Sequence, residues 1–148
     1  MPKSLWNVEA RQELLDRLER LRPESKPRWG RMNAPQMLAH LRMWMQMATG
    51  EVKTANKNLP LRHPPIKQLL IYWLPFPKGV PTAPELISRE SLDWASEHAA
   101  VRRYLQSLEA PGPGVKWPLH PAFGTITTRA WGVLAYRHTD HHFNQFGV

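Results

Sequence analysis

Residues 127–146 read TTRAWGVLAYRHTDHHFNQF, and the pattern in this stretch determines the class of fold. Apolar residues and two histidines recur mostly at steps of three and four, which is the spacing of one face of an α-helix. A face with large apolar side chains is expected to point into a core. The stretch therefore predicts a helix over Thr127–Phe146 whose inward face consists of Trp131, Leu134, Ala135, His138, His142 and Gln145.

A second helix is predicted over Ala34–Thr49. Asn33 is a good N-cap, Pro35 is tolerated in the first turn, and Gly50 favours a helix end. One face of this helix collects long apolar side chains around a histidine, and we expect it to be buried. Its members are Gln36, His40, Met43, Trp44 and Met47.

Two more helices are predicted, over Val8–Arg22 and Ser88–Glu109, and each ends before prolines. Both carry one apolar stripe. The stripes consist of Leu14, Leu18 and Leu21 in the first, and of Trp94, His98, Val101, Leu105 and Leu108 in the second.

A long connection, residues 51–86, contains seven of the 15 prolines and allows only a short helix over Ile66–Leu74. No stretch shows the sustained alternation of a strand. Four amphipathic helices with one long crossover predict an all-α protein, a four-helix bundle formed by a single domain over residues 1–148. The crossover is long enough for the second and third helices to run parallel.

The composition limits the chemistry. The chain has no cysteine, which excludes disulfides, zinc–thiolate sites and iron–sulfur clusters, so a metal needs His, Asp or Glu, and a thiol must come from outside. The net charge of +8 is scattered and accompanies no nucleic-acid-binding motif, so we expect no specific nucleic-acid partner.

The longest apolar run, Leu69–Leu74, cannot cross a bilayer, and the N-terminus does not resemble a secretory signal. We expect a cytoplasmic protein without a membrane partner.

His138 and His142 are four residues apart, so they lie about 40° apart around the helix axis and point the same way. Two imidazoles in this arrangement suit one metal ion, although two surface histidines would show the same spacing. The apolar residues on the same face favour the interpretation that both histidines point into the core. His40 alone would be read as a core histidine, but a bundle can bring it to the pair.

The remaining candidates are weaker. His141 lies on the edge of the face and is a fourth ligand, a base near the ligands or a surface residue, the last two being equally favoured. His98 is expected to be a core histidine and His120 to organise its loop. Asp140 lies on the face opposite His138, which excludes it as a ligand. The metalloprotease pattern H-E-x-x-H is absent, as are a glycine-rich phosphate loop and a G-x-S-x-G elbow.

Four blocks in order resemble a DinB-related family of unknown function within the DinB/YfiT-like superfamily. They are WGRMNAPQMLAH at 29–40, FPKGVPTAP at 76–84, HPAFG at 120–124, and Trp131-Gly132 followed by HTDHHFNQFG at 138–147. The resemblance covers nearly the whole chain. It implies an up-down-down-up four-helix bundle that is often a homodimer.

The resemblance also implies a metal triad with one histidine from the second helix and a His-x-x-x-His pair from the fourth. The ligands by this criterion are His40, His138 and His142, followed by Gln145; the family's usual His-Arg-Gly-Gln ending reads His142-Phe143-Asn144-Gln145 here. Three imidazoles and an open position suit Zn²⁺, Ni²⁺ or Fe²⁺.

Characterised relatives include transferases and isomerases that use a low-molecular-weight thiol. We therefore expect a metal-dependent S-transferase or isomerase acting on a small molecule, with His141 as the catalytic base. A metal-dependent hydrolase and a metal-binding bundle without catalysis are the alternatives.

Overall fold

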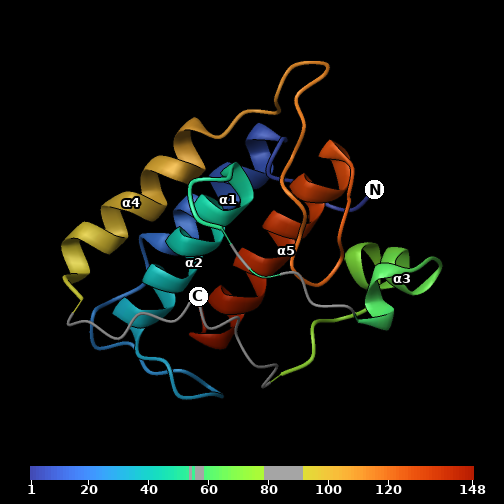
Figure 1. The fold of residues 1–148 in the computed structure, drawn as a ribbon. Coiled ribbons are helices and arrows are strands. Elements are labelled where there is room, and N and C mark those ends of the chain that lie inside the picture. Colours follow the sequence, from blue (N-terminus) through green and yellow to red (C-terminus); the bar gives the residue numbers. More distant parts are fainter. Residues whose placement is uncertain (54, 56–58, 79–91) are drawn as a thin grey trace.

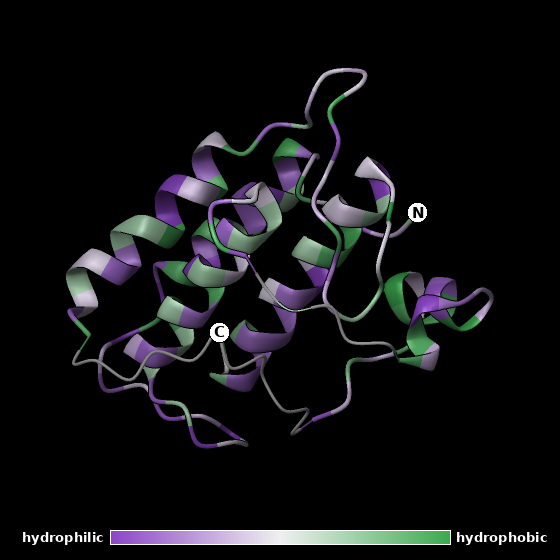
Figure 2. Ribbon diagram, in the orientation of Figure 1, coloured by the Kyte–Doolittle hydropathy of each residue, from purple (hydrophilic) through white to green (hydrophobic). Residues whose placement is uncertain are grey.

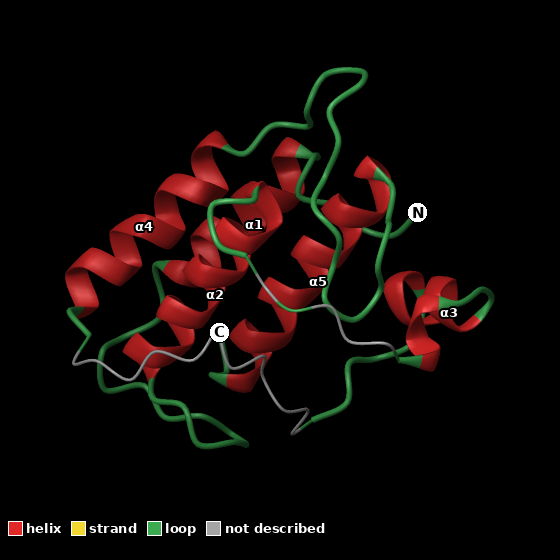
Figure 3. Ribbon diagram, in the orientation of Figure 1, coloured by secondary structure: helices red, strands yellow, loops and turns green. Residues whose placement is uncertain are grey.

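A computed structural model describes residues 1–53, 55, 59–78 and 92–148 of the chain. These residues are all-helical and contain no strand (Figures 1 and 3). The all-α prediction is confirmed, and the described residues contain five α-helices, one more than a four-helix bundle requires. The elements are α1 (Val8–Leu18), α2 (Ala34–Thr49), the 3₁₀ turn η1 (Pro60–Arg62), α3 (Ile66–Tyr72), α4 (Trp94–Ser107) and α5 (Thr128–Gln145).

Helix α2 has the bounds that its sequence predicted. Asn33 and Gln36 form a capping box, in which each side chain accepts a hydrogen bond of 2.9 Å from the backbone N–H of the other residue. Gly50 ends the helix with a φ of 85°, in the left-handed region where glycine is unstrained. His40 is thereby held in the middle of a helix that is fixed at both ends.

The first predicted helix is too long, because α1 ends at Leu18 rather than at Arg22. The amides of Arg20 and Leu21 bond to carbonyls three residues back, which tightens the chain, and Pro23 disfavours a helical Arg22. Leu21 is nevertheless buried, so the predicted apolar stripe is correct although its last residue is not helical.

The predicted start of the third long helix at Ser88 lies outside the described residues, as do residues 89–91. The described helix α4 begins at Trp94, because the Asp93 carboxylate accepts a hydrogen bond from the Ser96 amide and caps it. It ends at Ser107, two residues earlier than predicted. The short helix stops at Tyr72 instead of Leu74, and α5 agrees with its prediction to one residue at either end.

The core lies among α1, α2, α4 and α5, where α1 and α2 each contact both α4 and α5, while α3 lies at the edge of the molecule against α5 and η1 (Figure 1). Trp131 of α5 is 1 % exposed and stacks on Trp117 with ring centroids 5.4 Å apart. Within the described residues, no helix is both long enough and apolar enough to cross a membrane.

The C-terminal end of α5 is fastened to α1 by Arg17, whose guanidinium is buried. It forms an ion pair with Asp140 and donates hydrogen bonds to the Asn144 side chain and to the Val148 carbonyl. These contacts hold the last two turns of α5, which carry His138 and His142.

Candidate metal centre

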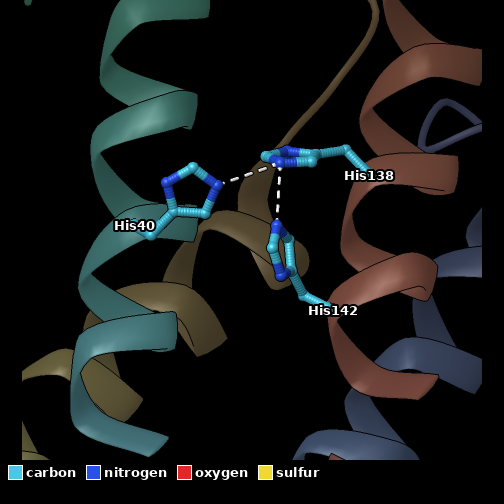
Figure 4. A group of neighbouring side chains, drawn as sticks. All are labelled: His40, His138 and His142. Atoms are coloured by element: carbon cyan, nitrogen blue, oxygen red, sulfur yellow. Dashed lines mark hydrogen bonds between the residues drawn. The ribbon is translucent and has the colours of Figure 1, made fainter. Parts of the chain in front are cut away.

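Three histidines from two helices meet in the interior. His40 comes from α2, whereas His138 and His142 come from α5, and one ring nitrogen from each lies within 4.8 Å of the other two. Nε2 of His138 is 3.1 Å from Nε2 of His40 and 3.1 Å from Nε2 of His142 (Figure 4). The structure thus brings together all three residues that the sequence singled out, and they could hold a metal ion.

The ring of His142 is oriented by Gln145, one turn further along α5. His142 Nδ1 lies 2.8 Å from Oε1 of Gln145, while Nε2 of the same amide donates to the carbonyl of Trp29 at 2.8 Å. Because that second bond fixes which end of the amide faces the imidazole, His142 Nδ1 must donate and carries the hydrogen. Its Nε2 therefore presents a lone pair to the other two histidines.

The three Nε2 atoms cannot all be satisfied by hydrogen bonds among themselves. A neutral imidazole nitrogen carries one hydrogen or offers one lone pair, and a single hydrogen on His138 Nε2 cannot lie along both of its 3.1 Å contacts. Nitrogens bound to one tetrahedral metal at about 2.1 Å are about 3.4 Å from each other. The donor set and its spacing therefore fit a divalent ion that takes nitrogen ligands.

Burial keeps the imidazoles of His138 and His142 neutral. It lowers the pKa of His142 to about 3, with a further contribution from His40. It also lowers the pKa of His138 well below its ordinary value, with His142 as the next cause. Neutral imidazole is the form that binds a metal, so the protein holds these ligands in the competent state without help from a base.

Aromatic side chains surround the group. The ring of Trp44 lies 5.0 Å from that of His138 and 5.7 Å from that of Trp131, which joins the site to the core. Nδ1 of His138 is buried without a hydrogen-bond partner in the described part of the chain, so no hydrogen bond at that atom orients the ring. The position of His138 depends on packing, whereas that of His142 depends on a hydrogen bond.

His141, the predicted base, is not a member of the three-histidine group. Its half-buried ring lies 5.3 Å from the ring of His142, and it packs against Trp29 at 5.6 Å and Phe76 at 5.8 Å. Burial lowers its pKa, Asp140 opposes this, and Lys78 adds to it. His141 is thus a neutral imidazole beside the group.

Of the two other predictions for histidines, the one for His120 is confirmed and the one for His98 is not. Nδ1 of His120 accepts hydrogen bonds from the amides of Ala122 and Phe123, at 3.1 and 3.2 Å, and so organises its loop. His98 is half-buried rather than part of the core, and its Nε2 lies 3.2 Å from the Leu18 carbonyl, which also accepts the Leu21 amide.

Sequence reasoning missed the segment that supports Gln145. Residues 28–30 cross the end of α5, where the Arg28 amide donates to the Gln145 carbonyl at 2.7 Å. Gly30 has a φ of 81°, and a Cβ there would lie 2.7 Å from the Gln145 amide nitrogen. The Trp-Gly pair at 29–30 was visible in the sequence, but nothing in the sequence indicated that it contacts a residue 116 positions away.

We expect Gln145→Leu to weaken metal binding by about 10- to 100-fold, because the substitution removes the acceptor that orients His142. Titration of the apo-protein with Zn²⁺ against a competing chelator measures the change. Gln12→Leu, on the exposed face of α1, is the matched control and should leave the affinity unaltered. Equal affinities for the two variants would show that Gln145 has no role in positioning the ring.

The chain belongs to a family described as "protein of unknown function (DUF1569)", whose model matches residues 2–147. No curated protein and no solved structure matches the chain.

Proposed function

We propose that this DUF1569 protein binds one divalent metal ion through Nε2 of His40, His138 and His142, and that it is a thiol-dependent S-transferase. The observation that carries the metal proposal is the convergence of three ring nitrogens, one from each histidine, within 4.8 Å of one another. Three imidazoles leave further coordination positions for a substrate, and they suit Zn²⁺, Ni²⁺ or Fe²⁺.

The transferase proposal is supported by the side chains around the histidines. Besides the Gln145 amide, aromatic and imidazole rings lie against these histidines in the described residues, with Trp44 against His138 and His141 against His142. A soft thiol sulfur is compatible with such surroundings, and the chain has no cysteine of its own to supply it. When bound, a divalent ion supplies the positive charge that lowers the pKa of a thiol.

The protein's own part in the reaction is to orient the ligands and to move one proton. His141, kept neutral by burial, accepts the proton from the thiol of the cosubstrate. The sulfur then forms a bond to the electrophilic carbon of the second substrate, and the leaving group departs with its electron pair. Trp29 and Phe76 hold the His141 ring beside the group.

We further infer that α1, α2, α4 and α5 form an up-down-down-up four-helix bundle of the DinB/YfiT-like kind. The contacts of α1 and α2 with both α4 and α5 support this arrangement. So does the origin of the histidines, one from the second long helix and an i, i+4 pair from the last. Helix α3 is an addition within the long crossover.

The test is a screen of glutathione and other cellular thiols against a chloronitrobenzene with metal-loaded protein. We expect saturable conjugation that requires the metal, and a decrease of about 10²- to 10⁴-fold in His141→Ala. His63→Ala, which removes an exposed histidine, is the control and should keep full activity. Metal-dependent ester hydrolysis without thiol turnover would instead establish the hydrolase, and silence in both assays would favour a metal-binding protein without catalysis.

A further inference from the structure

Helix α3 and the turn before it expose an unusual amount of apolar surface. Five of the nine exposed large hydrophobic residues in the described part of the chain lie between positions 59 and 74. Figure 2 shows the hydrophobic colouring of α3 at the edge of the molecule. We call this surface the α3 face; it consists of Leu59, Ile66, Leu69, Trp73 and Leu74, of which Trp73 is 73 % exposed.

Part of the α3 face is one stripe of a helix. Ile66, Leu69 and Trp73 follow one another at steps of three and four, so they lie on the same side of α3 and its C-cap. The opposite side is anchored, because Ile71 is buried and α3 packs on α5. The exposed stripe therefore faces away from α5, against which the other side of α3 packs.

Four cations surround this helix. Lys67 donates to the Thr125 carbonyl, Arg129 lies 5.9 Å from the ring centroid of Tyr72, and Arg137 donates to the carbonyls of Leu70 and Ile71. Arg62, in η1, lies against Gly124. None of the four has a carboxylate partner among the described residues, and the sequence between positions 52 and 84 contains no Asp or Glu.

We propose that the α3 face docks peripherally on an anionic lipid bilayer, with Trp73 at the interface and Arg62, Lys67 and Arg129 near lipid phosphates. An apolar stripe with a tryptophan and flanking Lys and Arg is the pattern of interfacial helices. A bilayer contact of this kind needs no spanning helix, so the proposal revises our expectation of no membrane partner. It is independent of the metal site.

Charge distinguishes the bilayer from other occupants. A second copy of the chain would bring the same cations to the same surface, and the two sets would repel each other. Nucleic acid would neutralise the cations, but the exposed side chains are aliphatic apart from Trp73, and aliphatic side chains do not stack on bases. An anionic bilayer satisfies both the charge and the apolar surface.

The experiment is co-sedimentation of the full chain with vesicles of phosphatidylcholine, alone or mixed with phosphatidylglycerol. We expect binding to the mixed vesicles that weakens as salt is raised. Leu69→Ser/Trp73→Ser should lower the partition coefficient by about 10- to 100-fold. The matched control is Val115→Ser/Leu119→Ser, which removes two exposed apolar residues elsewhere and should bind like the wild type.

Circular dichroism melting first establishes that both variants are folded, as expected for exposed positions. Absence of wild-type binding to the anionic vesicles, or equal binding of the two variants, would overturn the proposal. It would also be overturned by light scattering that shows a dimer of the wild type which Leu69→Ser/Trp73→Ser dissociates, because a second copy would then cover the α3 face. Binding to a DNA duplex in place of vesicles would overturn it as well.

Discussion

Chelation of the metal is expected to lower the Tm of the protein by about 8–16 °C. An ion present at a thousand times its Kd adds about 4 kcal/mol to the free energy of unfolding, because it binds only the folded state. For a chain of this size, 1 kcal/mol corresponds to about 2–4 °C. The three ring nitrogens already lie within 4.8 Å of one another in the folded chain, so the stabilisation should be reversible on adding metal back.

The stabilisation by metal should disappear when a ligand histidine is replaced. Elemental analysis of the wild type should find about one ion per chain, whereas His138→Ala and His142→Ala should retain almost none and show no metal-dependent Tm. His63→Ala, at an exposed position, should behave as the wild type. Full retention of metal by both ligand variants would exclude the site.

The sequence was sufficient to locate the candidate ligands because their chemistry coincides with helix periodicity. His138 and His142 share a face with Trp131 and Leu134, and the burial of that face follows from its apolar residues. The cap and stop signals of α2 likewise placed its bounds correctly, because they act within four residues along the chain.

Interactions between distant segments could not be predicted in this way. The contact between Gln145 and the Trp29 carbonyl depends on how a loop crosses the end of α5, which no local pattern encodes. The predicted end of α1 was wrong for a related reason. The turn after Leu18 is non-helical although its apolar stripe continues, because Leu21 reaches the core from a tighter backbone.

His120 gives a second large effect, on the stability of the protein in acid. Its ring is buried, its Nδ1 accepts two backbone hydrogen bonds, and burial lowers its pKa to about 3 from an ordinary value of 6.5. The folded protein therefore keeps His120 neutral at a pH where the unfolded chain binds a proton. Stability from this residue is fully present above pH 6.5 and is lost as the pH falls from there towards 3.

We expect this residue to contribute about 1.4 kcal/mol per pH unit to the loss of stability, or about 3 kcal/mol for a decrease of two units. The measurement is urea unfolding as a function of pH, with chelator present so that metal release does not add its own pH dependence. His120→Asn tests whether His120 causes this pH dependence of the free energy of unfolding, since an asparagine oxygen can accept the same kind of backbone hydrogen bond but does not titrate.

The informative quantity is how steeply the free energy of unfolding changes with pH in each variant. His120→Asn will lower stability at every pH, because the ring also packs on Trp131 at 5.4 Å, and that loss does not change with pH. The pH-dependent part of the free energy of unfolding should decrease by the contribution of one histidine. His63→Asn, at an exposed position, should leave the pH dependence as it is in the wild type. If His120→Asn and the wild type lose stability in parallel below pH 6.5, the imidazole of His120 takes up its proton equally in the folded and unfolded states, and the acid sensitivity comes from other titratable groups.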